Sequence, residues 1–343
     1  MTARERFLCV LNFNTPEDRL PLIEWAAWWD QTIRRWEAEG LPAGLVFDES
    51  LRYFGLDNLT CIGASCRSPR CPQEPTHSAG ILTDTESYEE VRPFLFPQTS
   101  IGELKTQAQQ LKERHDRGEI IIRLWLDGFF WFPRALFGIQ DHLFAFYDHP
   151  ELMHRMNGEL AEFHLRTIKE LLPILTPDMV GFAEDMSYNN GPMLSQACFN
   201  EFLLPYYHKV IPTLKKYGMK VMVDSDGDIT TMIPWLLEAG IEGVYPLERQ
   251  AGVDIGEIRR RYPDFLMLGG YDKMVMPLGE AAMRAEFERL LPAMQSGGYI
   301  PAVDHQTPPG VSLDNYRIYI RLFVEYAEKA VMESDSVARC RHG

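Results

Sequence analysis

The sequence predicts an α/β fold, a single (β/α)8 (TIM) barrel that forms one domain over residues 1–343. The main observation is a junction that recurs after residue 118, where a short apolar run stops at an acidic or aromatic-polar cluster and a helical pattern follows. Such runs are Glu119 to Trp125, Met179 to Ala183, Lys220 to Val223, Gly243 to Tyr245 and Tyr299 to Val303. In a parallel barrel every strand ends at one shared mouth, where the chemistry takes place.

The amino-terminal part has its own signals. Thr2 and Glu5 form a capping-box pattern before a helix that ends near Asn12, and Pro21 to Glu24 is expected to be the first strand. A helix from Trp28 to Glu39 should follow and stop at Gly40. Residues 55–98 are rich in proline and contain three cysteines, which predicts a loop-rich excursion.

From residue 100 onward, helices and strands are expected to alternate. Neither G-x-G-x-x-G after a strand nor G-x-x-x-x-G-K-[ST] occurs, which favours a barrel over the common nucleotide-binding sheets. No linker separates two domains. Besides the five runs above, a strand is expected over 265–268, with helices over 100–117, 139–146, 151–172, 196–217, 229–239, 254–261, 280–291 and 313–332.

The composition restricts the class of protein. Apolar residues make up 45% of the chain and charged residues 24%, as in ordinary globular proteins. The apolar runs are too short to span a membrane, and the amino terminus lacks the apolar core of a signal peptide, which predicts a cytoplasmic protein. A net charge of -15 argues against nucleic acid as a partner. Six cysteines in such a chain indicate reduced thiols.

Several segments, in the right order, resemble one known family. They are Thr2 to Leu8 with Asp18 to Pro21, Asp148 to Leu152, Leu194 to Phe202, and Gly297 to Ile300 with Pro308-Pro309. The chain resembles the uroporphyrinogen decarboxylase superfamily, which includes methyltransferases that move methyl groups to and from corrinoid or thiol carriers. The resemblance implies one (β/α)8 barrel with its pocket at the carboxyl ends of the strands, and a homodimer.

The chain departs from the true decarboxylases of that superfamily. These carry an Arg-Gln-Ala-Gly-Arg-Tyr signature shortly after the first strand, which grips the carboxylates of the substrate. The equivalent stretch here, Ile23 to Asp30, has an acid and three tryptophans in place of both arginines. Since guanidinium groups match carboxylate geometry as no aromatic side chain can, the sequence argues against decarboxylation of a porphyrinogen.

The methyltransferase branch implies a metal site. Its members bind zinc through His-x-Cys after one strand and a Cys near the last strand, and the matching positions here are Asp224, Asp226 and His305. All three replacements can bind a metal. Two carboxylates and a histidine suit Fe(II), Mn(II) or Zn(II) better than a site selected by thiolates. The resemblance also implies a partner protein that carries a corrinoid.

The same positions are candidates for acid and base catalysis. Asp224 and Asp226 end a strand and either bind metal or transfer protons, whereas Asp228 is expected only to cap the next helix. His305 is expected to transfer a proton or bind a ligand, the alternative being a structural role in the last loop. Of the adjacent pair Glu184 and Asp185, one carboxylate should face the pocket as an acid or base.

Other strand-end residues are expected to contact the substrate, although aromatic residues there often serve only packing. They are Trp25, Asp127, Tyr188, Tyr245, Glu248 and Tyr271. Cys61, Cys66 and Cys71 recur every five residues with His77 after them. They are either unrelated thiols, the favoured interpretation, or a metal or iron-sulfur clip.

Taken together, the sequence predicts an enzyme that acts on a small organic molecule, with methyl transfer involving a corrinoid protein ranked first. Asp224, Asp226, His305 and one of Glu184 and Asp185 would form its centre. Decarboxylation of uroporphyrinogen III is the second candidate. The third is a non-catalytic barrel that binds a small molecule at its mouth, because a fold does not fix a function.

Overall fold

The structure is a computed structural model that describes residues 1–74, 76 and 78–341, with the backbone alone over 333–341. His77 of the possible cysteine clip therefore lies outside the described residues. The chain forms two compact units. The first consists of Met1–Thr60, Arg114–Ile121 and Gly243–Gly343, and the second of Cys61–Glu113 and Ile122–Glu242. Among the described residues, no helix has both the length and the apolar character needed to cross a membrane.

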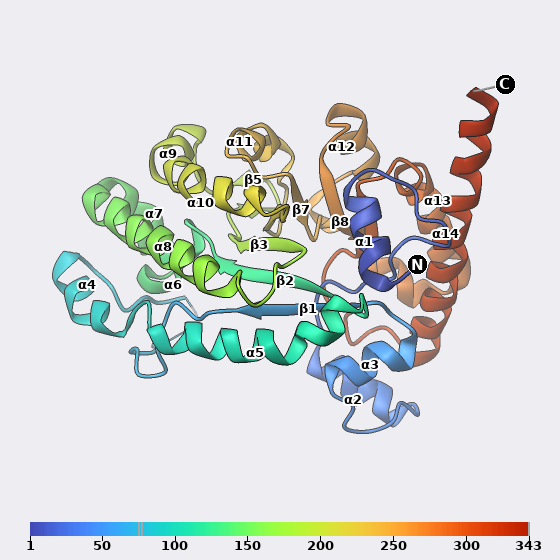
Figure 1. The fold of residues 1–343 in the computed structure, drawn as a ribbon, viewed down its shortest axis with the longest axis horizontal. Coiled ribbons are helices and arrows are strands. Elements are labelled where there is room, and N and C mark those ends of the chain that lie inside the picture. Colours follow the sequence, from blue (N-terminus) through green and yellow to red (C-terminus); the bar gives the residue numbers. More distant parts are fainter. Residues whose placement is uncertain (75, 77, 342–343) are drawn as a thin grey trace. The chain divides into compact units, whose positions relative to one another are not determined.

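Parallel strands alternate with helices along the chain (Figure 1). The seven main strands follow one another along a sheet in chain order, and every described pairing between them is parallel. An α/β fold with a seven-stranded parallel sheet is thus confirmed, whereas closure into an eight-stranded barrel stays a prediction. The strands of this sheet are β1 (Asn58–Gly63), β2 (Ile120–Asp127), β3 (Met179–Ala183), β6 (Lys220–Asp224), β7 (Gly243–Tyr245), β8 (Leu266–Tyr271) and β9 (Tyr299–Val303).

The first unit contains the terminal helices of the chain. Helix α1 has the predicted capping box, in which the Thr2 hydroxyl accepts the Glu5 N–H and the Glu5 carboxylate accepts the Thr2 N–H. Its core includes Phe287 stacked on Tyr326, with 5.1 Å between the ring centroids. The helices are α1 (Ala3–Leu11), α2 (Asp30–Ala38), α3 (Phe47–Phe54), α12 (Ile255–Arg261), α13 (Glu280–Met294) and α14 (Leu313–Arg341).

The predicted first strand, Pro21 to Glu24, is wrong: this buried segment forms no strand. It is held by hydrogen bonds to individual residues instead, among them the Asp57 N–H, which donates to the Leu22 carbonyl at 2.7 Å. The Asp57 carboxylate accepts the Leu22 N–H at 2.9 Å, and the Trp25 indole N–H donates to the Val303 carbonyl at 3.0 Å. Asp57 also pairs with Arg19 at 2.7 Å. Polar side chains here satisfy backbone groups that a strand partner would otherwise satisfy.

The second unit contains the middle of the chain. Strands β2 and β3 lie side by side (Figure 1), and β6 pairs with β3. The register pairs Asp127 with Ala183 and Ala183 with Asp224. The carboxyl ends of these strands are therefore level with one another. The other elements are helices α4 (Thr85–Val91), α5 (Gln98–Asp116), α6 (Trp131–Phe137), α7 (Ile139–Asp148), α8 (Pro150–Leu171), α9 (Gln196–Phe202), α10 (Leu204–Lys216) and α11 (Ile233–Glu238), and the short strands β4 (Ser187–Tyr188) and β5 (Gly191–Pro192).

Three further expectations need correction. The predicted loop-rich excursion over 55–98 begins with strand β1 and also contains helix α4, so it is more ordered than its prolines suggested. The helix expected over 196–217 is divided into α9 and α10, with Pro205 in the first turn of α10. The helix expected over 229–239 is a 3-10 turn, Thr230–Met232, followed by α11 with Pro234 in its first turn. Proline lacks an N–H and interrupts the helical hydrogen bonds.

Candidate active site

Three carboxylates of the second unit gather where β3 and β6 end. Oxygen atoms of Asp185, Asp224 and Asp226 lie within 4.8 Å of one another. Asp224 is the last residue of β6, and Asp185 follows β3 by two residues. Because the two strands are parallel neighbours in register, their ends place these side chains together. We call these three residues the acidic cluster.

The backbone around the acidic cluster is held in an unusual conformation. The Asp224 carbonyl accepts the N–H of Glu184 at 2.9 Å and of Asp185 at 3.3 Å, and Asp185 has a φ of 42°. Gly227, after Asp226, has a φ of 81°, and a Cβ atom there would lie 2.7 Å from the Tyr188 backbone. Backbone strain of this kind is typical of functional sites.

The acidic cluster favours a bound proton or a cation. Burial raises the pKa of Asp224 well above its ordinary range, and the carboxylates of Asp185 and Asp226 raise it further, while Arg123 acts in the opposite direction. Like charges that close together do not all ionise unless a positive charge compensates them. The donor set, three carboxylates within reach of a common point, fits a hard divalent ion such as Mn(II), Fe(II) or Zn(II).

Glu184, predicted as a possible acid or base, is buried with only 1% of its surface exposed. Its carboxylate accepts the backbone N–H groups of Phe129, Phe130 and Trp131 at 2.8, 2.7 and 3.1 Å, and also the hydroxyl of Tyr207. Burial raises the pKa of Glu184 to about 7, although these donors lower it. Because all four donors bind this one carboxylate, Glu184 positions the turn before α6. Of the adjacent acids Glu184 and Asp185, it is Asp185 that belongs to the acidic cluster.

Asp127, at the end of β2, lies beside a cysteine. Burial raises the pKa of Asp127, while contact with the Cys66 thiol lowers it. Among the described residues, Cys61, Cys66 and Cys71 belong to no group of side chains close enough to share a metal ion. Both interpretations of these thiols, separate or part of a clip, stay predictions.

In the first unit, four predicted residues lie together at the ends of β7 and β9. The Trp25 ring meets His305 edge-on at 5.9 Å between ring centroids and lies 5.7 Å from Tyr245. A carboxylate oxygen of Glu248 and a ring nitrogen of His305 lie within 4.8 Å of each other. An imidazole beside a carboxylate and an aromatic face can bind a ligand or transfer a proton.

The two remaining predicted substrate residues have different surroundings. Tyr271 is fully buried, its hydroxyl donates to the Met283 carbonyl at 3.4 Å, and its ring packs 4.6 Å from Phe287. Its neighbours are those of a core residue. Tyr188 is 49% exposed and its backbone contacts Gly227, beside the acidic cluster. Contact of either tyrosine with a substrate stays a prediction.

The predicted metal set of Asp224, Asp226 and His305 is divided between the two units, because His305 belongs to the first. Within the second unit, Asp185 is the third carboxylate that accompanies Asp224 and Asp226. Joint action of these two carboxylates with His305 stays a prediction. The sequence signal for Asp185, Asp224 and Asp226 was that acidic residues follow the ends of two strands.

Two buried acids of the first unit were missing from the predicted site. Glu24 accepts the Tyr316 hydroxyl at 3.2 Å, and burial raises its pKa to about 8. Asp304 accepts the N–H groups of Arg249 and Lys273 at 3.0 and 3.2 Å and pairs with the Lys273 ammonium at 3.2 Å. Burial raises the pKa of Asp304 to about 6, which Lys273 opposes. Glu24 directly precedes Trp25, and Asp304 directly precedes His305. This proximity to predicted site residues could have identified both acids from the sequence.

Parallel strands that alternate with helices define the class of this protein as α/β. Residues 136–326, more than half of the chain, match the family model described as uroporphyrinogen decarboxylase (URO-D). The chain belongs to the uroporphyrinogen decarboxylase family. No curated protein sequence matches it.

Solved structures resemble the fold. A methyltransferase from Methanosarcina mazei superposes with a TM-score of 0.67 and 13% identity, covering 95% of this chain and 99% of its own. A putative vitamin-B12-independent methionine synthase from Listeria monocytogenes gives a TM-score of 0.46 at 11% identity, over 92% and 98% of the two chains. A B12-independent methionine synthase from Shewanella sp. W3-18-1 gives 0.42 at 14% identity, over 67% of each chain. At such identities the first likeness shows the fold alone, and the two lower scores add nothing to it.

Proposed function

We propose that this chain is a methyltransferase that removes a methyl group from a small organic molecule and passes it to a reduced corrinoid on a partner protein. One observation carries the proposal, namely the acidic cluster of Asp185, Asp224 and Asp226 at two adjacent strand ends. Family membership supports an enzyme, and a methyltransferase from Methanosarcina mazei shares the fold.

The acidic cluster has a specific task in such a reaction. When a methyl group leaves an oxygen, nitrogen or sulfur atom of the substrate, the bond electrons stay on that atom, which must then take up a proton. Burial and two neighbouring carboxylates raise the pKa of Asp224 and so favour its protonated form, whose carboxyl group would donate this proton. A proton taken from water by Asp185 or Asp226 and passed on to Asp224 would restore its protonated form.

A divalent cation at the acidic cluster is the alternative way to balance its charge. Such an ion would polarise the leaving atom as a Lewis acid. Asp185, Asp224 and Asp226 would hold it through carboxylate oxygens. Elemental analysis of protein purified without chelator distinguishes the two cases: a cation site predicts stoichiometric metal that is lost in Asp226→Asn, and a proton site predicts none.

The test of the proposal is methyl transfer to cob(I)alamin from a panel of methyl ethers, methylamines and methyl thioethers, followed by the absorbance of methylcobalamin. Wild type should transfer from at least one class, and Asp224→Asn should reduce the rate at least about 100-fold. Asp228→Ala is the matched control, because Asp228 accepts the Thr230 N–H at 2.9 Å in the turn before the 3-10 helix and is not part of the acidic cluster. Decarboxylation of uroporphyrinogen III without any methyl transfer would sink the proposal. A ligand that binds and emerges unchanged would favour the non-catalytic barrel.

A further inference from the structure

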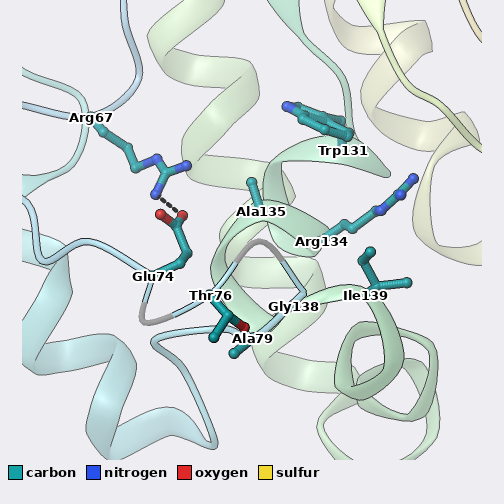
Figure 2. Close-up of a pocket in the computed structure, with 9 residues that line it drawn as sticks. All are labelled: Arg67, Glu74, Thr76, Ala79, Trp131, Arg134, Ala135, Gly138 and Ile139. Atoms are coloured by element: carbon teal, nitrogen blue, oxygen red, sulfur yellow. Dashed lines mark hydrogen bonds and ion pairs between the residues drawn. The ribbon is translucent and has the colours of Figure 1, made fainter.

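A pocket apart from the acidic cluster lies within the second unit, between the loop that follows β1 and helices α6 and α7. Its volume is about 230 Å³. In Figure 2, Arg67 and Glu74 form one wall, and Trp131 and Arg134 lie on the opposite side with Ala135 between them. The lining residues are Arg67, Glu74, Thr76, Ala79, Trp131, Arg134, Ala135, Gly138 and Ile139. None of them belongs to the acidic cluster.

We propose that this pocket binds a small planar molecule that carries one oxyanion group, a carboxylate or a phosphate. The charge of the lining favours an anion, because two arginines and a single glutamate line the pocket in a chain whose net charge is -15. The proposal concerns a site apart from the acidic cluster and does not depend on methyl transfer.

Arg134 supplies the first element of recognition. One of its terminal N–H groups donates to the Asp185 carbonyl at 2.7 Å, which fixes the side chain, and the guanidinium carbon lies 5.2 Å from the centre of the Trp131 ring. A guanidinium group has five N–H donors in a planar fork that matches an oxyanion. The described hydrogen bond uses one of these donors, and under the proposal others of them bind the oxyanion.

Glu74 shows that the pocket accepts a carboxylate. Its side chain lines the cavity and is hydrogen-bonded to the Arg67 guanidinium (Figure 2). A ligand anion would replace this internal partner on Arg67 or occupy Arg134 beside it. Glu74 therefore competes with the ligand, and its removal should strengthen binding.

The remaining lining sets the shape and size of the ligand. Trp131 offers an aromatic ring, and Ala79, Ala135 and Ile139 add apolar surface. The volume is below the usual range of pockets for drug-sized ligands, so the occupant is about the size of one substituted ring. The Leu136 carbonyl accepts the N–H groups of Ile81 and Leu82 at 2.7 and 3.0 Å, which holds the end of the loop on α6.

Calorimetric titration with benzoate, phenyl phosphate, cyclohexanecarboxylate and neutral benzamide tests the site. Benzoate or phenyl phosphate should bind, and the tighter of the two identifies the oxyanion as carboxylate or phosphate. Benzamide should bind at least about tenfold more weakly, since a hydrogen bond to a charged group contributes more than one to a neutral group. Cyclohexanecarboxylate should also bind more weakly, because it cannot stack on Trp131.

Substitutions separate this site from adventitious binding. Arg134→Gln should weaken binding of the anion about tenfold or more, whereas Glu74→Gln should strengthen it several-fold, a gain that a purely structural role cannot produce. The matched control is Arg166→Gln, because Arg166 also lies over an aromatic ring, Phe163 at 5.5 Å, but outside the pocket.

Ala135→Leu keeps every charge and fills the cavity, so it should abolish binding even if Arg134→Gln were to fold poorly. Equal affinity of wild type, Glu74→Gln and Ala135→Leu for benzoate and phenyl phosphate would overturn the proposal. Binding of benzamide as tight as that of benzoate would also overturn it. Loss of methyl transfer in Asp224→Asn with unchanged benzoate binding is expected, which keeps the two proposals distinguishable.

Discussion

The hydroxyl of Tyr207 donates to the carboxylate of Glu184 inside the second unit, where both side chains are almost completely buried. The same carboxylate accepts three consecutive backbone N–H groups at the turn between β2 and α6. One acid thus links β3, helix α10 and this turn. It also sits one residue before Asp185, so its anchoring fixes the backbone that presents a member of the acidic cluster.

Glu184→Gln should destabilise the protein by about 1–3 kcal/mol. The amide NH2 group of glutamine would face groups that are themselves donors, which leaves at least one buried N–H or O–H without an acceptor. Urea unfolding measures the change. Tyr207→Phe removes one of the four donors and should cost less, about 0.5–1.5 kcal/mol. Equal stability of wild type and Glu184→Gln would show that the carboxylate does not hold this turn.

Gly128→Ala should be strongly destabilising, because a Cβ atom at residue 128 would lie 2.0 Å from the Glu184 carboxyl carbon and 2.3 Å from the Ala183 carbonyl oxygen. Gly102 offers the matched control. It lies inside α5 with open space around the Cβ position, so Gly102→Ala should raise stability by roughly 0.5–1 kcal/mol. Thermal unfolding of the two variants should therefore shift in opposite directions, and a shift of both in the same direction would contradict this account.

Much of the fold could be predicted, since β3, β7 and β9 have the expected bounds and α1 has the expected cap. Periodicity and capping are local properties that a sequence displays directly. The failures arise where a distant side chain decides the local structure. The segment from Pro21 to Glu24 looks like a strand, but Asp57, more than thirty residues away, satisfies its backbone.

The candidate site was predictable in part for the same reason. Strand-end acidity located Asp185, Asp224 and Asp226, because parallel strands bring their carboxyl ends to one edge. Which member of the pair Glu184 and Asp185 turns toward the other acids depends on donors at residues 129–131 and 207, which no local pattern reveals. The pocket apart from the acidic cluster was not foreseen, since Arg67 and Arg134 are far apart in the sequence and neither ends a strand.

Stability should depend on pH through Glu24. Burial raises its pKa from 4.5 to about 8, a change that a hydrogen bond from Tyr316 opposes. Below pH 4.5 the carboxyl group is protonated in both folded and unfolded chains. Between 4.5 and 8 only the folded chain retains this proton, so Glu24 makes the free energy of unfolding decrease as pH rises, by at most about 1.4 kcal/mol per pH unit.

The check for Glu24 is urea unfolding of wild type and Glu24→Gln at pH 5, 6.5 and 8. Glutamine resembles the protonated acid, so the variant should gain stability relative to wild type as pH rises through this window. Glu328→Gln, a substitution at an exposed position, should keep the wild-type dependence on pH. A constant difference between wild type and Glu24→Gln at all three values would disprove the assignment.

Repulsion among the carboxylates of the acidic cluster should lower the free energy of unfolding at high pH. Burial and the carboxylates of Asp185 and Asp226 raise the pKa of Asp224 well above 3.8, so the stability that its protonated form contributes is present in acid and is lost as pH rises. Asp224→Asn removes this charge and should stabilise the protein at pH 8 by roughly 0.5–2 kcal/mol, with little effect at pH 3.5, while it should reduce turnover at least about 100-fold. Asp228→Ala should instead cost about 1 kcal/mol, because it removes the acceptor of the Thr230 N–H. Urea unfolding at pH 3.5 and pH 8 measures the change in the free energy of unfolding for both variants. An Asp224→Asn protein less stable than wild type at pH 8 would show that the three carboxylates do not repel one another.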